Sequence, residues 1–100
     1  MHLIQILLPL LPGASGSADE RFAGLKAELT EKFGGVTVFQ QSLAEGLWND
    51  GGKVVRDAIV VFEVMAEALD REWWARFRAR LERDFQQDVV VARSYQIELL

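Results

Sequence analysis

The strongest structural signal in the sequence is a tight turn at mid-chain, where the run Asn-Asp-Gly-Gly occupies positions 49–52. Two-residue turns between antiparallel strands require positive φ, which Gly adopts without a steric penalty and Asn or Asp tolerate. The longest β-rich stretch of the chain, from Ala58 to Met65, follows shortly afterwards. The sequence therefore predicts a β-hairpin at mid-chain, with this stretch on its return arm.

The composition limits the chemistry that the chain can perform. One hundred residues, half of them hydrophobic and three of them Trp, are expected to form a single domain over residues 1–100 with one real core. No cysteine is present, which excludes disulfides, Cys-based zinc sites and thiol catalysis, and a single histidine, His2, excludes multi-His metal sites. We therefore expect no metal and no cofactor. The net charge of −4 argues against a nucleic-acid partner, since nucleic-acid-binding domains usually carry a basic stripe.

The apolar run from Met1 to Pro12 has two interpretations. It resembles the hydrophobic part of a secretory signal, with a passable cleavage site at residues 16–18, or it is a buried strand ended by Pro9 and Pro12. We favour the strand, because no Lys or Arg precedes the run, Gln5 interrupts it, and it is too short to span a bilayer. The expected location is then the cytoplasm, without membrane association.

The first helix is predicted from Ser17 to Phe33. Ser17 and Glu20 fit an S-x-x-E capping box, and apolar residues recur at steps of three and four, which gives one stripe for the core. Gly34, followed by a second glycine, supplies the left-handed residue that ends a helix.

The second helix is predicted from Arg71 to about Phe85, with Asp70 as its cap. Its arginines alternate with acidic residues, as in Glu72 four positions before Arg76. This pattern favours a solvated outer face linked by ion pairs over the alternative, an anion-binding surface. The arginines concerned are Arg71, Arg76, Arg78, Arg80 and Arg83.

The order of elements predicts the fold. Residues 36–42 and 89–98 form two further β-rich stretches, so the chain runs strand, helix, strand, strand, helix, strand. Two βαβ halves with right-handed crossovers give the α+β, ferredoxin-like βαββαβ fold, in which a four-stranded antiparallel sheet carries both helices on one face.

The face of the sheet away from the helices is unusually apolar. The first strand places Leu3, Gln5 and Leu7 on one face, and the third strand places Val61 and Glu63 among aliphatic neighbours. Such a face needs a cover. We expect a homodimer in which two copies of this open sheet face pack about a two-fold axis, as in dimeric α+β barrels.

Glu63 is the sharpest functional candidate on that face. A buried carboxylate without a cationic partner has a raised pKa, which suits it to acid or base chemistry. The alternative, which we favour, is that Glu63 pairs with Arg93 or Arg56 at the edge of the dimer. His2 is similarly interpreted as the end of a strand rather than as a catalytic base.

The hairpin carries a family resemblance. The run Glu45–Asp57, between the segments FGGVT at 33–37 and FQQD at 85–88, resembles an uncharacterised family of small bacterial domains with a G-x-W-x-D-x-x-G-x-x-x-R-like hairpin. The glycines stand about one position away from that pattern. The resemblance extends over most of the chain, implies a ferredoxin-like fold and brings no established activity.

Three classes of function follow. The favoured one is a homodimeric binding module with a cleft for a small organic anion at the hairpin and the sheet face, in which Trp48 is an apolar wall, Arg56 is the anion anchor and Glu45 is a further candidate. For the hairpin itself we favour a structural alternative, in which Trp48 plugs the end of a core and Arg56 is held by Asp57 or Glu45. Gln5 and Glu63 are the candidates from the sheet face. The alternative is a cofactor-independent enzyme of the dimeric α+β barrel type that uses Glu63 or His2 for proton transfer. An RNA-recognition role is excluded, because the open faces of the two central strands offer no aromatic residue for base stacking. They carry Leu3, Gln5, Leu7, Ile59, Val61 and Glu63.

Overall fold

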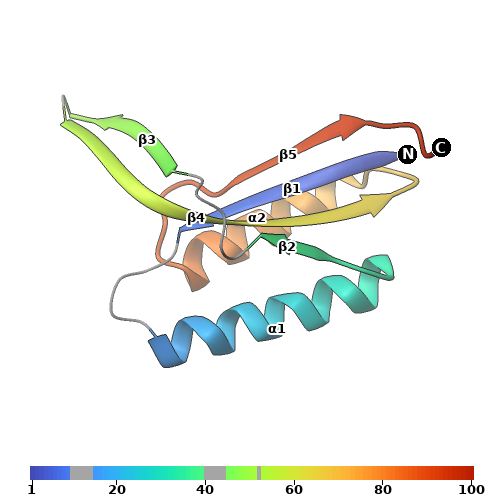
Figure 1. The fold of residues 1–100 in the computed structure, drawn as a ribbon, viewed down its shortest axis with the longest axis horizontal. Coiled ribbons are helices and arrows are strands. Elements are labelled where there is room, and N and C mark those ends of the chain that lie inside the picture. The colour runs from blue at the N-terminus through green and yellow to red at the C-terminus, as the bar shows by residue number, and fades with distance from the viewer. Residues whose placement is uncertain (10–14, 40–44, 52) are drawn as a thin grey trace.

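The computed structural model describes residues 1–9, 15–39, 45–51 and 53–100. The elements follow the order β1 (His2–Pro9), α1 (Ser15–Phe33), β2 (Thr37–Phe39), β3 (Glu45–Asp50), β4 (Lys53–Ala66), α2 (Arg71–Asp84) and β5 (Val91–Gln96). Figure 1 shows the strands as one twisted layer, from which the arm formed by β3 and the start of β4 protrudes. The N- and C-termini lie at the opposite end of this layer.

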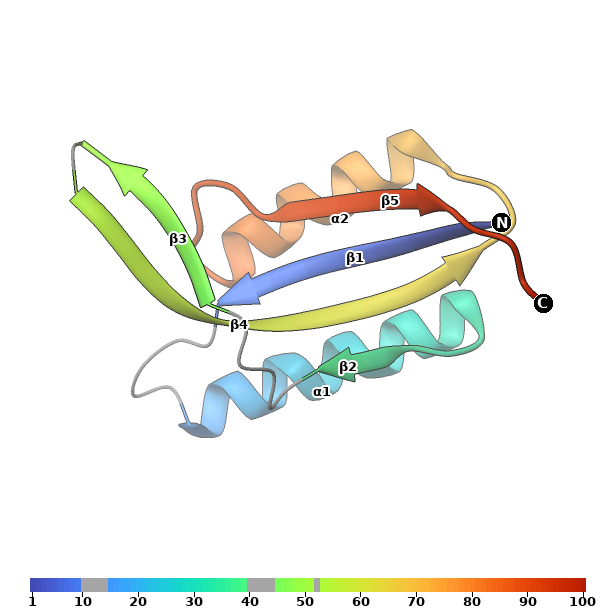
Figure 2. The ribbon, with the colours of Figure 1, turned by 45° about the horizontal axis from the view of Figure 1, so that its top comes forward.

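The main sheet has the strand order β2-β4-β1-β5, and every neighbouring pair is antiparallel. Both helices lie on the same side of this sheet (Figure 2). The arrangement confirms the predicted ferredoxin-like α+β fold, including the central position of β1 and β4. Among the described residues, no helix lies on the other side of the sheet.

The hairpin differs from the prediction in one respect. Strand β4 is long enough to belong to two ladders: its first part pairs with β3, and its second part pairs with β1 and β2. Of the stretch predicted as one strand over 36–42, Thr37–Phe39 form β2 and residues 40–42 lie outside the described residues, whereas β3 is an additional strand. Asp50 pairs with Lys53, so the turn falls where the glycines predicted it, and Gly51 has a φ of +60°. Residue 52 lies outside the described residues.

The core lies between the sheet and the two helices. The buried residues Ile4, Ile6 and Leu8 of β1 and Val60, Phe62 and Val64 of β4 occupy alternate positions, because side chains alternate between the two faces of a strand. The most enclosed large side chain is Phe62, whose ring centroid lies 5.6 Å from that of Phe22 on α1. The buried core residues are Ile4, Ile6, Leu8, Phe22, Leu25, Leu29, Val60, Phe62, Val64, Trp74, Phe77, Leu81, Phe85 and Val90.

The N-terminal apolar run is a strand in the folded chain. It ends at Pro9 and pairs with β4 on one side and β5 on the other, which agrees with the favoured interpretation. Pro12 lies outside the described residues. Within the described ranges, neither helix is long and apolar enough to cross a bilayer.

The helix ends follow the predictions in three of four cases. The side chain of Asp70 accepts a hydrogen bond of 3.1 Å from the backbone N–H of Trp73, as expected of an N-cap. Gly34 ends α1 with a φ of +83°, and the last helical residue of α2 is Asp84, next to Phe85. The predicted start of α1 is wrong, because the helix begins at Ser15 and Ser17 is already inside it.

The C-terminal end of α2 gives the first testable prediction. Gln86 has a φ of +53°, and the N–H groups of Gln86 and Gln87 donate to the carbonyls of Arg83 and Glu82, at 3.3 and 2.8 Å. This is a Schellman ending, in which glycine is preferred at the left-handed position. Gln86→Gly is therefore expected to raise the free energy of unfolding by about 1 kcal/mol in a urea titration. Gln86→Ala, which cannot relieve the backbone, should bring no such gain.

Candidate binding surface on the open sheet face

The face of the sheet opposite the helices is built from the odd-numbered positions of β1, β4 and β5. Their registers place residues in rows that run across the strands. The middle row is polar and reads Thr37, Glu63, Gln5, Arg93 from β2 to β5. The two flanking rows are mainly apolar, so the face is a polar stripe between apolar ones.

Gln5 is the centre of a hydrogen-bond network in the polar row. Its Nε2 donates to Glu63 Oε1 at 2.6 Å, and its Oε1 accepts from Arg93 Nε at 2.9 Å and from the hydroxyl of Tyr95 at 3.3 Å. The amide thus joins an acidic residue of β4 to a basic residue of β5. The network links side chains of β1, β4 and β5 on the sheet and restricts their conformations.

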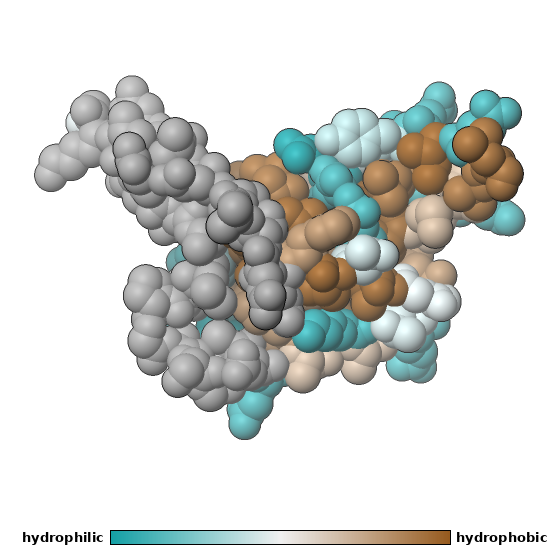
Figure 3. Space-filling view, viewed as in Figure 1, coloured by the Kyte–Doolittle hydropathy of each residue, from teal (hydrophilic) through white to brown (hydrophobic). Residues whose placement is uncertain are grey.

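The apolar rows leave large side chains half exposed. One row contains Phe39, Val61, Leu7 and Val91, and the other contains Met65, Leu3 and Tyr95. The side chains at the ends of these rows are 44–48% exposed. Figure 3 shows apolar residues over the sheet and around the termini, with hydrophilic residues between them.

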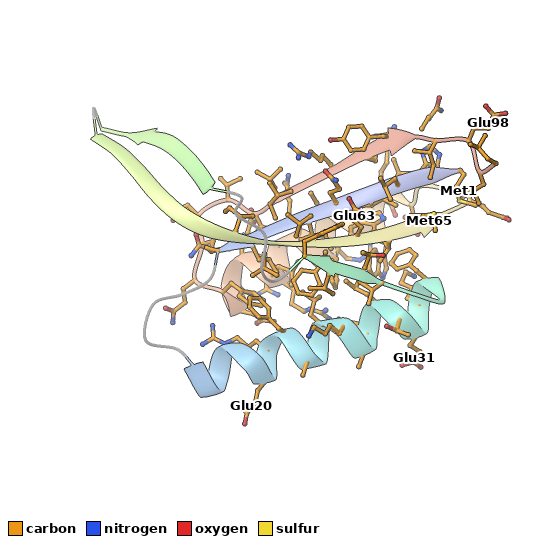
Figure 4. The ribbon with its side chains drawn as sticks, viewed as in Figure 1. Met1, Glu20, Glu31, Glu63, Met65 and Glu98 are labelled. Atoms are coloured by element: carbon orange, nitrogen blue, oxygen red, sulfur yellow. The ribbon has the colours of Figure 1, made fainter. Side chains whose placement is uncertain are left out.

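Glu63 is neither isolated nor fully buried. It is partly exposed and accepts the amide of Gln5, whereas Arg93, one of its two predicted partners, reaches Gln5 rather than the carboxylate. Figure 4 shows Glu63 on the middle of β4, with Met65 further along the strand, while Glu20 and Glu31 point away from the sheet on α1. His2 has the parity of the core-facing positions of β1, so it and Glu63 belong to opposite faces.

The hairpin candidates are placed by their register alone. Trp48 pairs with Val55, and Arg56 pairs with Leu47. Because neighbouring rungs of a ladder alternate between its faces, Trp48 and Arg56 occupy positions on opposite faces of the hairpin. Glu45 pairs with Ala58 and so shares the face of Arg56.

The side chains of Glu45, Trp48 and Arg56 lie outside the described part of the structure, so their role toward a small organic anion stays a prediction. Arg56 and Glu63 are seven positions apart on β4, which is about 23 Å along a strand. The hairpin candidates and the pair formed by Gln5 and Glu63 are therefore two separate sets. In the described ranges, no group of three His, Cys, Asp or Glu side chains could hold a metal ion.

The sequence alone did not single out Tyr95 or the role of Gln5 as a bridge. Both follow from the register of β1 against β5, which places Leu3 opposite Tyr95 and Gln5 opposite Arg93. Alternation within β5 puts Arg93 and Tyr95 on one face, which is a signal that the sequence does carry. The pairing partner across the strands is the information that only the structure supplies.

Two comparisons with known proteins give no match. No family model matches the chain, and no curated protein is similar to it in sequence. The resemblance of the hairpin to an uncharacterised bacterial family therefore stays a prediction, although the fold that it implies is confirmed.

Solved structures of CutA proteins are similar to this chain. The divalent cation tolerance protein CutA1 from Thermus thermophilus aligns with a TM-score of 0.64 at 15% identity, over 97% of this chain and 84% of its own. CutA1 from Pyrococcus horikoshii gives 0.59 at 14%, over 100% and 86%. The PII-like protein CutA from Nostoc gives 0.57 at 16%, over 98% and 82%. At these identities the likeness shows that the chain has the ferredoxin-like fold of the CutA structures.

Proposed function

We propose that this protein is a self-associating binding module whose open sheet face packs against the same face of a second copy. The observation that supports the proposal most is the pair of apolar rows on either side of the polar row. Four large side chains of this face, Phe39, Met65, Val91 and Tyr95, are 44–48% exposed in the single chain. A contiguous apolar patch of this kind on a small domain marks an interaction surface.

The polar row supports a second copy as the occupant. It runs from the acidic Glu63 through Gln5 to the basic Arg93, so the face carries both charges. When two identical faces meet about an axis parallel to the strands, the acidic end of one row lies over the basic end of the other. The face is therefore complementary to itself, and the simplest closed assembly is the homodimer.

A metal-related role is not carried over from the CutA proteins. The words "divalent cation tolerance" describe the Thermus protein, and 15% identity shows the fold alone. The described residues of this chain offer no cluster of metal ligands that would give such a role an independent basis.

The proposal predicts the effect of a charge in the middle of an apolar row. Val61→Lys is expected to convert the assembly to a monomer in sedimentation velocity at micromolar concentration, because an ammonium group buried between two sheets lacks a partner. Far-ultraviolet circular dichroism should retain the helix signal, since Val61 does not face the helices.

Ala23→Lys is the matched control, because it adds the same charge at an exposed position of α1 on the other side of the molecule. It should leave the sedimentation coefficient unchanged. A wild-type chain that sediments as a monomer under these conditions would show that the face does not mediate self-association.

A further inference from the structure

A groove separates the start of α2 from the outer edge of the sheet, away from the open face. Its volume is about 260 Å³, which is at the small end for a ligand site. The buried Ile4 and Trp74 line it together with Leu69, and the exposed Arg71, Arg78 and Ser94 also contribute to its lining. Arg93 is a third arginine of the lining, but its Nε already donates to Gln5. No acidic residue lines it.

The residues that α2 contributes to the groove form a regular pattern along the helix. Arg71, Trp74, Ala75 and Arg78 are spaced by three or four residues and so form one stripe of the helix. The two arginines are the ends of the stripe, about 10.5 Å apart along the helix axis, and the two apolar residues lie between them. The stripe therefore alternates as cation, apolar surface, cation.

Neither arginine has a bonding partner in the part of the chain that the structure describes. Arg80, on another side of the same helix, forms an ion pair with Glu28 of α1, whereas Arg71 and Arg78 make no hydrogen bond or ion pair with any other described residue. Their guanidinium groups are available, and guanidinium binds carboxylate in a bidentate manner.

The edge strand adds donors to the groove. β5 pairs only with β1 among the described strands, and Ile97 donates its backbone N–H to Met1 at 3.0 Å. Hydrogen bonding in an antiparallel pair involves alternate residues, so the odd positions of β5 bond to β1 and the backbone N–H of Ser94 points outward from the sheet. The hydroxyl and the N–H of Ser94 can therefore both donate to a ligand at the groove.

We propose that the groove between α2 and β5 binds an aliphatic dicarboxylate. Each carboxylate is held by one of the two arginines, the apolar spacer lies over Trp74 and Ala75, and Ser94 donates to the ligand from the strand edge. Two point contacts joined by an apolar middle match this class better than inorganic phosphate, which has no apolar part. The site adjoins the open sheet face at Arg93, but its two proposed carboxylate ligands, Arg71 and Arg78, lie on α2 and not on that face.

The test uses suberate, an aliphatic dicarboxylate of comparable length to the spacing of the arginines, and octanoate, which has the same number of carbons but one carboxylate. Isothermal titration calorimetry of the full chain should show saturable binding of suberate at millimolar concentration or below, and clearly weaker binding of octanoate. In ¹⁵N-resolved spectra, suberate should shift the amides of Ala75 and Ser94 and leave those of Leu7 and Glu63 in place.

Arg71→Gln and Arg78→Gln should each weaken suberate binding about tenfold or more, because each removes one charge-assisted contact. Arg76→Gln is the matched control: it makes the same charge change at an exposed position of the same helix that does not line the groove. These positions are all exposed, so each variant should keep the wild-type circular dichroism and sedimentation behaviour.

Three results would overturn the proposal. They are the absence of saturable suberate binding, equal binding of octanoate and suberate, and a loss in Arg76→Gln as large as in Arg71→Gln or Arg78→Gln. The last would mean that only the general charge of α2 attracts the anion.

Discussion

Phe62→Ala is expected to lower the free energy of unfolding by about 3–5 kcal/mol. Phe62 is 0% exposed, lies opposite Ile6 in the sheet and contacts the ring of Phe22 on α1. Truncation removes the burial of the ring and leaves a cavity where the sheet meets the helix. Since small domains have a stability of about 5–15 kcal/mol, the loss is a large part of the total. Urea unfolding followed by circular dichroism, at a fixed chain concentration, measures it.

Phe39→Ala provides the matched control for this change. Phe39 is the same residue type in the same sheet, but it is 44% exposed and lies on the open face. Its removal should cost the isolated fold about 1 kcal/mol or less, while weakening self-association. Equal losses in the two variants, with the assembly dissociated by dilution, would contradict the assignment of the two faces of the sheet.

Trp74→Ala is expected to have an effect of similar size, about 3–5 kcal/mol. The side chain of Trp74 is 8% exposed. Its ring is stacked on Phe33 with centroids 5.5 Å apart and meets Phe77 edge-on at 5.6 Å. This residue joins the end of α1 to the start of α2, so its loss removes both core volume and the contact between the helices.

Comparison with Trp73→Ala distinguishes the contribution of burial to the free energy of unfolding from that of aromatic contact. Trp73 is only partly buried, although it stacks on Phe77 at 4.7 Å and has Lys32 Nζ at 4.4 Å from its ring. We expect a loss of about 1–2 kcal/mol from the aromatic pair and the cation–π contact. If Trp73→Ala destabilised the chain as much as Trp74→Ala does in the same urea titration, the aromatic contacts rather than burial would determine the stability of this region.

The division of the sheet into a core face and an open face could be predicted from the sequence. Alternation in β1 and β4 is regular, and Ile4, Ile6, Val60 and Phe62 are buried as their parity requires. The turn at Gly51 and the cap at Asp70 could also be predicted, because each depends on a backbone requirement that few residues satisfy.

The limits of the sequence lie in contacts between distant segments. The predicted start of α1 is two residues too late. Both Ser15 and Ser17 are favourable near a helix N-terminus, so local propensity does not distinguish between them. The presence of β2 and β3 as two separate strands depends on where β4 changes partners, which is a tertiary property. The hydrogen bond from Arg93 to Gln5 instead of Glu63 depends on the register of β5 against β1.

The groove beside α2 also depends on contacts between distant segments, which the sequence does not predict. The arginines of α2 are evident in the sequence, and their alternation with acidic residues favours mutual neutralisation. The structure shows that Arg80 pairs with α1 and that Arg71 and Arg78 flank an apolar groove instead. An arginine of α2 forms an ion pair only where a neighbouring element brings an acidic side chain close to it, as α1 does for Arg80. The spacing of residues along α2 does not predict which arginine this is.

The central position of β1 has a consequence for how the protein is made. β1 is synthesised before its two neighbours in the sheet, β4 and β5. Ile4 can pair with Val64 only after β4 has been synthesised, and with Ser94 only after β5 has been synthesised, close to the end of the described chain. Until then its apolar side chains on both faces have no sheet to join. Folding of such a non-local topology is slow and leaves hydrophobic segments exposed to other chains. We therefore expect the nascent chain to require protection by chaperones, and its recovery on expression to depend on the rate of translation.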